Sequence, residues 1–404
     1  MHPRQTREAR KARDERDPDR PDALRGEGSR FARGRPASIL LALALGSVAA
    51  GLIFALAYRE LFGRVDAPFV PPTVDAELRA ERMQKLVAQA ERQYRIKSPI
   101  YHHDLARNKS IDAARWGVGK YRLRTNSLGF KDREVRDVPL RSDAHRILFM
   151  GDSFTEGVGL EYAKTFVGII DDELATEGIE VLNGAVSSYS PAIYRRKVRY
   201  LIETVGLEFD EVVVFIDISD AQNDGETYYV DDDGIVRKNA ATPDQAETFD
   251  ITTRRYGDGR RRGLWTVDAA AFEKYGRIGL EHMSENMSAL HALLQEHGIA
   301  LTVAIYPWPE QVLAGDLESI QVTHWRAWCE QRDIPLVDYF PVFIRGQSRR
   351  QHEKMLERFY MPGDVHWTEK GHERVAEIFL ENYHERRRGA ATRDVAEEVA
   401  KEAS

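Results

Sequence analysis

Five short apolar runs, separated by longer amphipathic stretches, constrain the fold of this chain more than any other feature of its sequence. The first run, Ile147 to Met150, suits a strand that is buried on both faces of a sheet. The same pattern recurs at Val181–Leu182, Val212–Ile216, Leu301–Tyr306 and Leu336–Val337. Helical stretches lie between or after these runs, near residues 161–176, 191–205, 269–297, 317–332 and 368–384. Strands that alternate with helices predict an α/β fold, with a parallel sheet covered by helices on both faces.

A second feature is an apolar segment of 22 residues without charge, from Ala37 to Tyr58. At a rise of about 1.5 Å per residue, a helix of this length crosses a hydrocarbon core of about 30 Å. The preceding residues 1–36 contain 11 Arg and Lys against 7 Asp and Glu, and such a basic flank stays in the cytoplasm. The sequence therefore predicts a single-pass membrane protein with a cytoplasmic N-terminus, whose remaining residues lie in the periplasm or outside the cell.

The alternative is a removed signal peptide, because Ala55-Leu56-Ala57 resembles a small-residue cleavage site. The long polar leader and the length of the apolar run favour an uncleaved anchor, and both interpretations export residues 59–404. Those residues carry a net charge of −11, since the whole chain carries −7, which argues against nucleic acid as a partner. The single cysteine excludes an intrachain disulfide framework and a Cys-rich zinc site.

The composition along the chain predicts six segments. Residues 59–120 contain a Pro-containing linker and an Ala-Glu-Arg-rich helical pattern, and are expected to separate the membrane from one folded domain. The polar, Gly-rich stretch within that domain is expected to be a long surface insertion. The expected plan is a basic disordered tail at 1–36, a signal anchor at 37–58, a linker and juxtamembrane helix at 59–120, a domain at 121–385 with an insertion at 223–268, and a polar tail at 386–404.

Two short motifs carry the chemistry. Gly151-Asp152-Ser153 follows the first apolar run directly, which places the serine at the carboxyl end of a strand, where ligands bind in sheets of this kind. Far downstream, Asp364-Val365-His366 lies just before the last helix. A serine hydroxyl needs a base within hydrogen-bond reach, and His366 can take its proton while Asp364 orients the imidazole. Ser153, His366 and Asp364 are therefore the candidate catalytic residues.

These motifs resemble those of the SGNH, or GDSL-type, hydrolases. The first block of that family matches Gly151-Asp152-Ser153, and its last block, Asp and His before the final helix, falls on Asp364 and His366. The second and third blocks resemble Asn183-Gly184-Ala185 and Asp217-Ile218-Ser219-Asp220, and residues 126–130 resemble an NSLGF lead-in. The resemblance covers about residues 121–385 and implies a three-layer α/β/α domain that performs serine-based acyl transfer.

The resemblance also implies an oxyanion hole. Its donors would be the N–H groups of Ser153 and of Gly184 or Ala185, together with Ser219 or Asn223. The chain departs from the family pattern here, because Ala185 stands where the second-block glycine aligns and Ser219 replaces the third-block asparagine. An alanine still offers its N–H, and a hydroxyl can donate in place of an amide. The Asp-x-His spacing followed by Trp is similar to the alginate O-acetyltransferase branch, whose members act outside the inner membrane on polysaccharides.

Three functions remain open from the sequence. The first is a membrane-anchored serine esterase that removes O-acyl groups from a glycan or cleaves a small ester. The second is an O-acyltransferase that modifies a cell-envelope polysaccharide with a donor presented by a membrane acyl-donor protein, and the third is a catalytically weak glycan-binding scaffold. Tyr306-Pro307-Trp308-Pro309 ends a strand on the same side as the site, where it either lines a pocket or packs the core. The region holds no metal-ligand motif and no phosphate-binding loop, so no cofactor and no metal are expected.

Overall fold

The computed structural model describes residue 89 and residues 91–402 except 117–118, 240–263, 267 and 347, without the side chains of 264, 275 and 390–402. The predicted tail at 1–36, the predicted anchor at 37–58 and most of the predicted insertion lie outside these residues. No helix in this described part of the chain has the length and apolar character that crossing a membrane requires.

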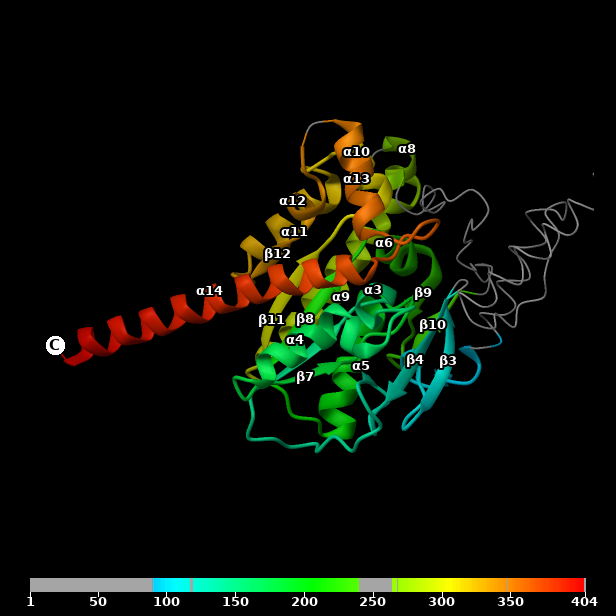
Figure 1. The fold of residues 1–404 in the computed structure, drawn as a ribbon. Coiled ribbons are helices and arrows are strands. Elements are labelled where there is room, and N and C mark those ends of the chain that lie inside the picture. Colours follow the sequence, from blue (N-terminus) through cyan, green and yellow to red (C-terminus); the bar gives the residue numbers. More distant parts are fainter. Residues whose placement is uncertain are drawn as a thin grey trace, which may run out of the picture. The chain divides into compact units, whose positions relative to one another are not determined.

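An eight-stranded sheet organises the domain (Figure 1). Its order is β12 (Leu336–Asp338), β11 (Ala300–Ile305), β8 (Glu211–Ile216), β6 (Arg146–Met150), β7 (Glu180–Asn183), β5 (Lys131–Asp132), β4 (Gly119–Thr125) and β3 (Ser110–Trp116). The first five strands run parallel to one another, and they are the five apolar runs of the sequence. The all-parallel prediction is wrong for the other three strands, since β5 pairs antiparallel with β7, β4 with β5, and β3 with β4.

Helices cover both faces of the parallel strands, as expected. α4 (Phe166–Ala175) connects β6 to β7, whereas α5 (Pro191–Arg199), α9 (Arg277–Glu296) and α11 (Ile320–Glu330) connect strands in the opposite direction across the sheet. Right-handed crossovers place α4 on one face and the other three helices on the opposite face. α14 (Glu369–Glu402) packs beside α4, and α5 packs beside α9. β6 and β8 are buried along their whole length, so the core lies on both sides of the sheet centre.

The remaining elements are short. The helices and helical turns are α3 (Ser153–Glu156), η1 (Tyr162–Lys164), η2 (Tyr200–Val205), α6 (Ser219–Gln222), η3 (Asn223–Thr227), η4 (Leu264–Thr266), α8 (Ala269–Ala271), η5 (Phe272–Gly276), α10 (Pro309–Ala314), α12 (Phe340–Phe343) and α13 (Arg349–Phe359). Two hairpins pair antiparallel, β1 (Arg95–Ser98) with β2 (His102–Leu105) and β9 (Tyr228–Val230) with β10 (Val236–Lys238).

Three expected segment boundaries are wrong. The domain begins before residue 121, because β3 lies in the linker range predicted at 59–120 and pairs with β4 in the central sheet. The range 223–268 is not an exposed insertion throughout, since Asp224 and Trp265 at its two ends are buried. The range 386–404 is no separate tail in its described part, because α14 continues through it and Arg386 Nη1 lies 3.8 Å from Glu211 Oε1.

Candidate active site

Ser153 lies at a sharp turn from β6 into α3. Asp152 caps the helix, because its Oδ1 accepts a hydrogen bond from the Phe154 N–H at 3.0 Å. Gly151 is required before it, since a Cβ at this position would lie 2.1 Å from Thr155 Oγ1. Gly157, at φ +71°, ends the helix after a single turn. The sequence Gly-Asp-Ser thus fixes the serine at the carboxyl end of the central strand, as the motif predicts.

His366 and Asp364 meet Ser153 from the loop between α13 and α14. Ser153 Oγ lies 2.7 Å from His366 Nε2, and His366 Nδ1 lies 2.6 Å from Asp364 Oδ1. The carboxylate defines the tautomer: Nδ1–H donates to Asp364, which leaves Nε2 to accept the serine proton. The structure therefore brings the three candidate catalytic residues into one hydrogen-bonded chain, across 213 residues of sequence.

The three residues are buried by aromatic side chains. Ser153 and His366 are each 2% exposed, and Asp364 is 8% exposed. The Phe154 ring lies 4.6 Å from the His366 ring between centroids, and the Trp116 ring lies 5.0 Å from it at an interplanar angle of 88°. Such low exposure strengthens electrostatic interactions among these groups, because little water screens them.

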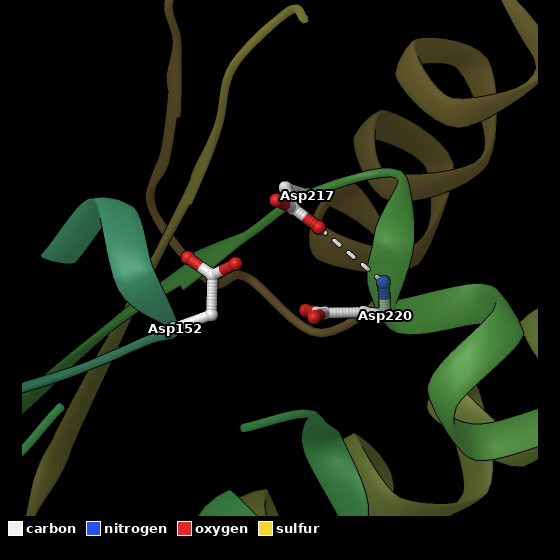
Figure 2. Close-up of side chains that lie close together, drawn as sticks. All are labelled: Asp152, Asp217 and Asp220. Atoms are coloured by element: carbon white, nitrogen blue, oxygen red, sulfur yellow. Dashed lines mark hydrogen bonds between the residues drawn. The ribbon is translucent and has the colours of Figure 1, made fainter. Parts of the chain in front are cut away.

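Three buried aspartates form an acidic cluster beside Ser153 (Figure 2). Asp152 comes from the turn before α3, Asp217 follows β8 directly, and Asp220 lies in α6. Their side chains each offer one ligand atom, and these atoms lie within 4.8 Å of one another, which is the kind of spacing a cation site needs. Ser153 Oγ also lies 3.3 Å from Asp152 Oδ2, so one member of the cluster contacts the nucleophile directly.

Hydrogen-bond donors and raised pKa values reduce the negative charge of this cluster. Asp217 accepts hydrogen bonds from the N–H groups of Ser219 and Asp220 and from Trp308 Nε1, at 2.7, 3.3 and 2.8 Å. Burial raises the pKa of Asp152 well above its usual range, and the neighbouring charge of Asp217 raises it further. Burial also raises the pKa of Asp220, with Asp217 and Asp152 adding to the shift. These shifts favour the protonated, neutral form of Asp152 and Asp220, which reduces the repulsion between Asp152 and negative charge that develops on Ser153.

Two side chains of the Tyr306–Pro309 segment donate hydrogen bonds to this cluster. Tyr306 Oη donates to Asp152 Oδ1 at 3.1 Å, and Trp308 Nε1 donates to Asp217 as described above. Both rings are buried, at 0% and 3% exposed. The sequence leaves open whether this segment lines a pocket or packs in the core. The burial and hydrogen bonds of Tyr306 and Trp308 fit packing in the core.

Some of the expected oxyanion donors already make hydrogen bonds within the protein, and others do not. The prediction for Gly184 is wrong, because its N–H donates to the Phe149 carbonyl at 2.9 Å and extends the β6–β7 pairing. The Ala185 N–H donates to Asn183 Oδ1 at 3.2 Å within its own turn. Within the described part of the chain, the Ser153 N–H makes no hydrogen bond, so it stays available to an oxyanion. Ser219 and Asn223 are buried on the segment that carries Asp217 and Asp220, and both stay candidates through their side chains.

Sequence reasoning missed two residues that support the site. Trp116 Nε1 donates to Asp364 Oδ2 at 2.8 Å. Glu156 is fully buried, accepts the Ser187 N–H at 2.7 Å and pairs with Arg95 at 3.1 Å. Both contacts involve the strands before residue 121. The signal that could have found Trp116 is the alternating pattern of residues 110–125 on either side of the sequence Gly-Val-Gly, whereas Glu156 and Arg95 lie outside this range.

Comparisons with known proteins find distant likenesses among solved structures. No protein-family model matches the chain, and no curated protein matches it. The esterase EstA from Pseudoalteromonas sp. is 14% identical, with 60% of this chain and 97% of that chain covered at a TM-score of 0.34. The acetyl xylan esterase AlAXEase is 14% identical, with 58% and 98% covered at 0.37. A GDSL-like lipase from Bacteroides thetaiotaomicron is 14% identical, with 61% and 92% covered at 0.34.

Proposed function

We propose that this protein is a serine esterase of the SGNH type that cleaves O-acyl ester bonds through Ser153, His366 and Asp364. One observation carries the proposal: the continuous hydrogen-bonded chain from Ser153 Oγ through the imidazole to Asp364, with distances of 2.7 and 2.6 Å, at the carboxyl end of the central strand. Serine, base and orienting acid in this order are the requirements for activating a hydroxyl nucleophile.

In the proposed reaction, Ser153 attacks the ester carbonyl and passes its proton to His366. The imidazolium is stabilised by Asp364, and the Ser153 N–H donates to the oxyanion of the tetrahedral intermediate. His366 then returns the proton to the leaving alcohol, which departs and leaves an acyl-serine. Water then attacks the acyl carbon as His366 takes its proton. The bond between the acyl carbon and Ser153 Oγ breaks, and His366 returns the proton to Oγ, which releases the acid and restores the serine.

The proposed substrate class is an acylated glycan or a small ester outside the cytoplasm. Its support is the sequence: the uncharged segment 37–58 and the basic residues 1–36 favour a membrane anchor with the domain on the far side. Protease added to sealed right-side-out spheroplasts should remove an epitope tag placed at the C-terminus. A tag that the protease cannot reach would contradict this placement.

Hydrolysis of a short-chain p-nitrophenyl ester by the full chain tests the activity. The rate should fall to the uncatalysed level in Ser153→Ala and stay unchanged in Ser110→Ala, whose exposed serine lies on β3. Equal rates in the native chain and Ser153→Ala would contradict the proposal. Adding an oligosaccharide acceptor separates water from a sugar hydroxyl as the second substrate, because acyl transfer to the sugar gives a product that mass spectrometry detects.

A further inference from the structure

The orienting acid Asp364 has two oxygens, and each has its own partner. Oδ1 faces His366 and also accepts the Val365 N–H at 2.6 Å. Oδ2 accepts the indole N–H of Trp116 at 2.8 Å, from a residue 248 positions earlier in the chain. In the described part of the chain no other donor serves Oδ2. The two groups therefore depend on each other, because Trp116 and Asp364 are only 6% and 8% exposed and little water can replace this bond.

Trp116 also limits the orientation of the base. Its ring meets the His366 ring edge to face, with centroids 5.0 Å apart and planes at 88°. The indole thus contacts both members of the Asp–His pair, through a hydrogen bond to one and ring packing on the other. Rotation of the imidazole away from Ser153 would need the indole to move.

The indole is itself held by the N-terminal strands. Trp116 is the last residue of β3 and pairs with Gly119 of β4. On the other side, Gly159 packs against it at φ +83°, where a Cβ would lie 3.4 Å from Trp116 Cδ1. β4 is tied to β5 and β5 to β7, so the position of the indole is set by the central sheet.

From this geometry we infer that Trp116 is a positioning residue for the Ser153 reaction, which acts through Asp364 and makes the N-terminal strands a functional part of the active site. The inference deepens the proposed function and rests on it for its kinetic readout. Without the indole N–H, the Asp364 carboxylate loses a donor that shares its charge. It then stabilises a protonated His366 more strongly, and it holds the imidazole less firmly toward Ser153.

The other charged groups around His366 do not replace Trp116. Asp152 lies on the α3 side, where burial and then the charge of Asp217 raise its pKa well above the usual range. His372 on α14 is buried, and burial, followed by the charges of Lys131 and His366, lowers its pKa to about 3. The carboxylate that contacts the imidazole directly is that of Asp364, at 2.6 Å.

The test compares Trp116→Phe with the native full chain. Phenylalanine keeps a ring and removes the N–H, so kcat for p-nitrophenyl acetate should fall about tenfold while KM stays within about twofold. The acid limb of the kcat/KM profile should move to higher pH. In an Asp364→Asn background, Trp116→Phe should cause no further loss of kcat, because Trp116 acts through that carboxylate.

Trp328→Phe is the matched control, since Trp328 is a buried indole on α11 whose Nε1 donates to Ser288 Oγ at 3.4 Å. It should leave kcat and the pH profile unchanged. The inference is overturned if Trp116→Phe behaves like Trp328→Phe, or if its loss persists undiminished in the Asp364→Asn background.

A second readout does not depend on activity. The ring of His366, assigned in histidine-labelled protein with His366→Gln, is titrated by NMR in the native chain and in Trp116→Phe. A higher titration midpoint in Trp116→Phe supports the inference, and identical midpoints overturn it. Absence of any ester hydrolysis by the native chain would instead overturn the proposed function, and the titration would still decide the role of Trp116.

Discussion

Removing the charge of Glu156 should destabilise the domain strongly. The Glu156 side chain is fully buried one turn after the proposed nucleophile, and Arg95 of β1 reaches it with 15% of its own side chain exposed. Losing one partner of a buried ion pair costs about 3–5 kcal/mol, and the lower end applies because Arg95 is partly hydrated. At about 2–4 °C per kcal/mol for a domain of this size, Glu156→Gln should lower the melting temperature by about 6–12 °C.

The assay is thermal and urea unfolding of Glu156→Gln beside Glu161→Gln. Glu161 pairs with Arg122, which is 64% exposed, so its removal should cost less than about 1 kcal/mol. Arg95→Met should destabilise by a similar amount to Glu156→Gln, and the double variant should lose less than the two single losses together, because each single loss already includes the Arg95–Glu156 interaction. Equal small effects of Glu156→Gln and Glu161→Gln, or full additivity with Arg95→Met, would refute this account of how the N-terminal hairpin is attached.

Three further changes have defined outcomes. Asp364→Asn should lower kcat about 10⁴-fold with KM little changed, because the amide favours the wrong tautomer of His366, and wild-type kcat would contradict this role. The pKa of about 3 at His372 lies below its unfolded value, so native stability should be complete above pH 6.5 and be lost as pH falls toward 3, by up to about 5 kcal/mol. His372→Asn should flatten this part of the stability curve measured by urea unfolding, and parallel curves would contradict the assignment. Asn183→Ala removes the amide that donates to the Thr155 carbonyl at 2.9 Å, and should cost about 1–3 kcal/mol in the same assay, whereas an unchanged midpoint would show that this bond contributes nothing.

The parallel strands could be predicted because each is a continuous apolar run. β6 and β8 lie between helices on both faces, so nearly every side chain is buried and the signal is strong. β3 and β4 have charged and exposed positions between their buried ones, and β5 has only two residues. Such strands at the side of a sheet resemble linker sequence, which is why the predicted linker range 59–120 extends into the domain.

The proposed catalytic residues were visible because each lies in a short motif next to a strand or a helix. The hydrogen bond from Trp116 that supports them could not be predicted, since Trp116 and Asp364 are 248 residues apart and no local pattern links them. No local sequence pattern predicts the hydrogen bond from the Gly184 N–H to the Phe149 carbonyl, because it depends on how far the β6–β7 pairing extends. Motifs thus identify the reacting groups, whereas hydrogen bonds between distant segments decide which backbone donors are free to act.

Labelling with a fluorophosphonate probe tests the central claim most directly, because the probe forms a bond only with a serine that a neighbouring base activates. The full chain should gain one phosphonate group, and peptide mass spectrometry should place it on Ser153. Ser153→Ala should take up no probe, and His366→Ala should react far more slowly. A native chain that stays unlabelled, or one labelled at another residue with Ser153 unmodified, would contradict the assignment of Ser153 as the nucleophile.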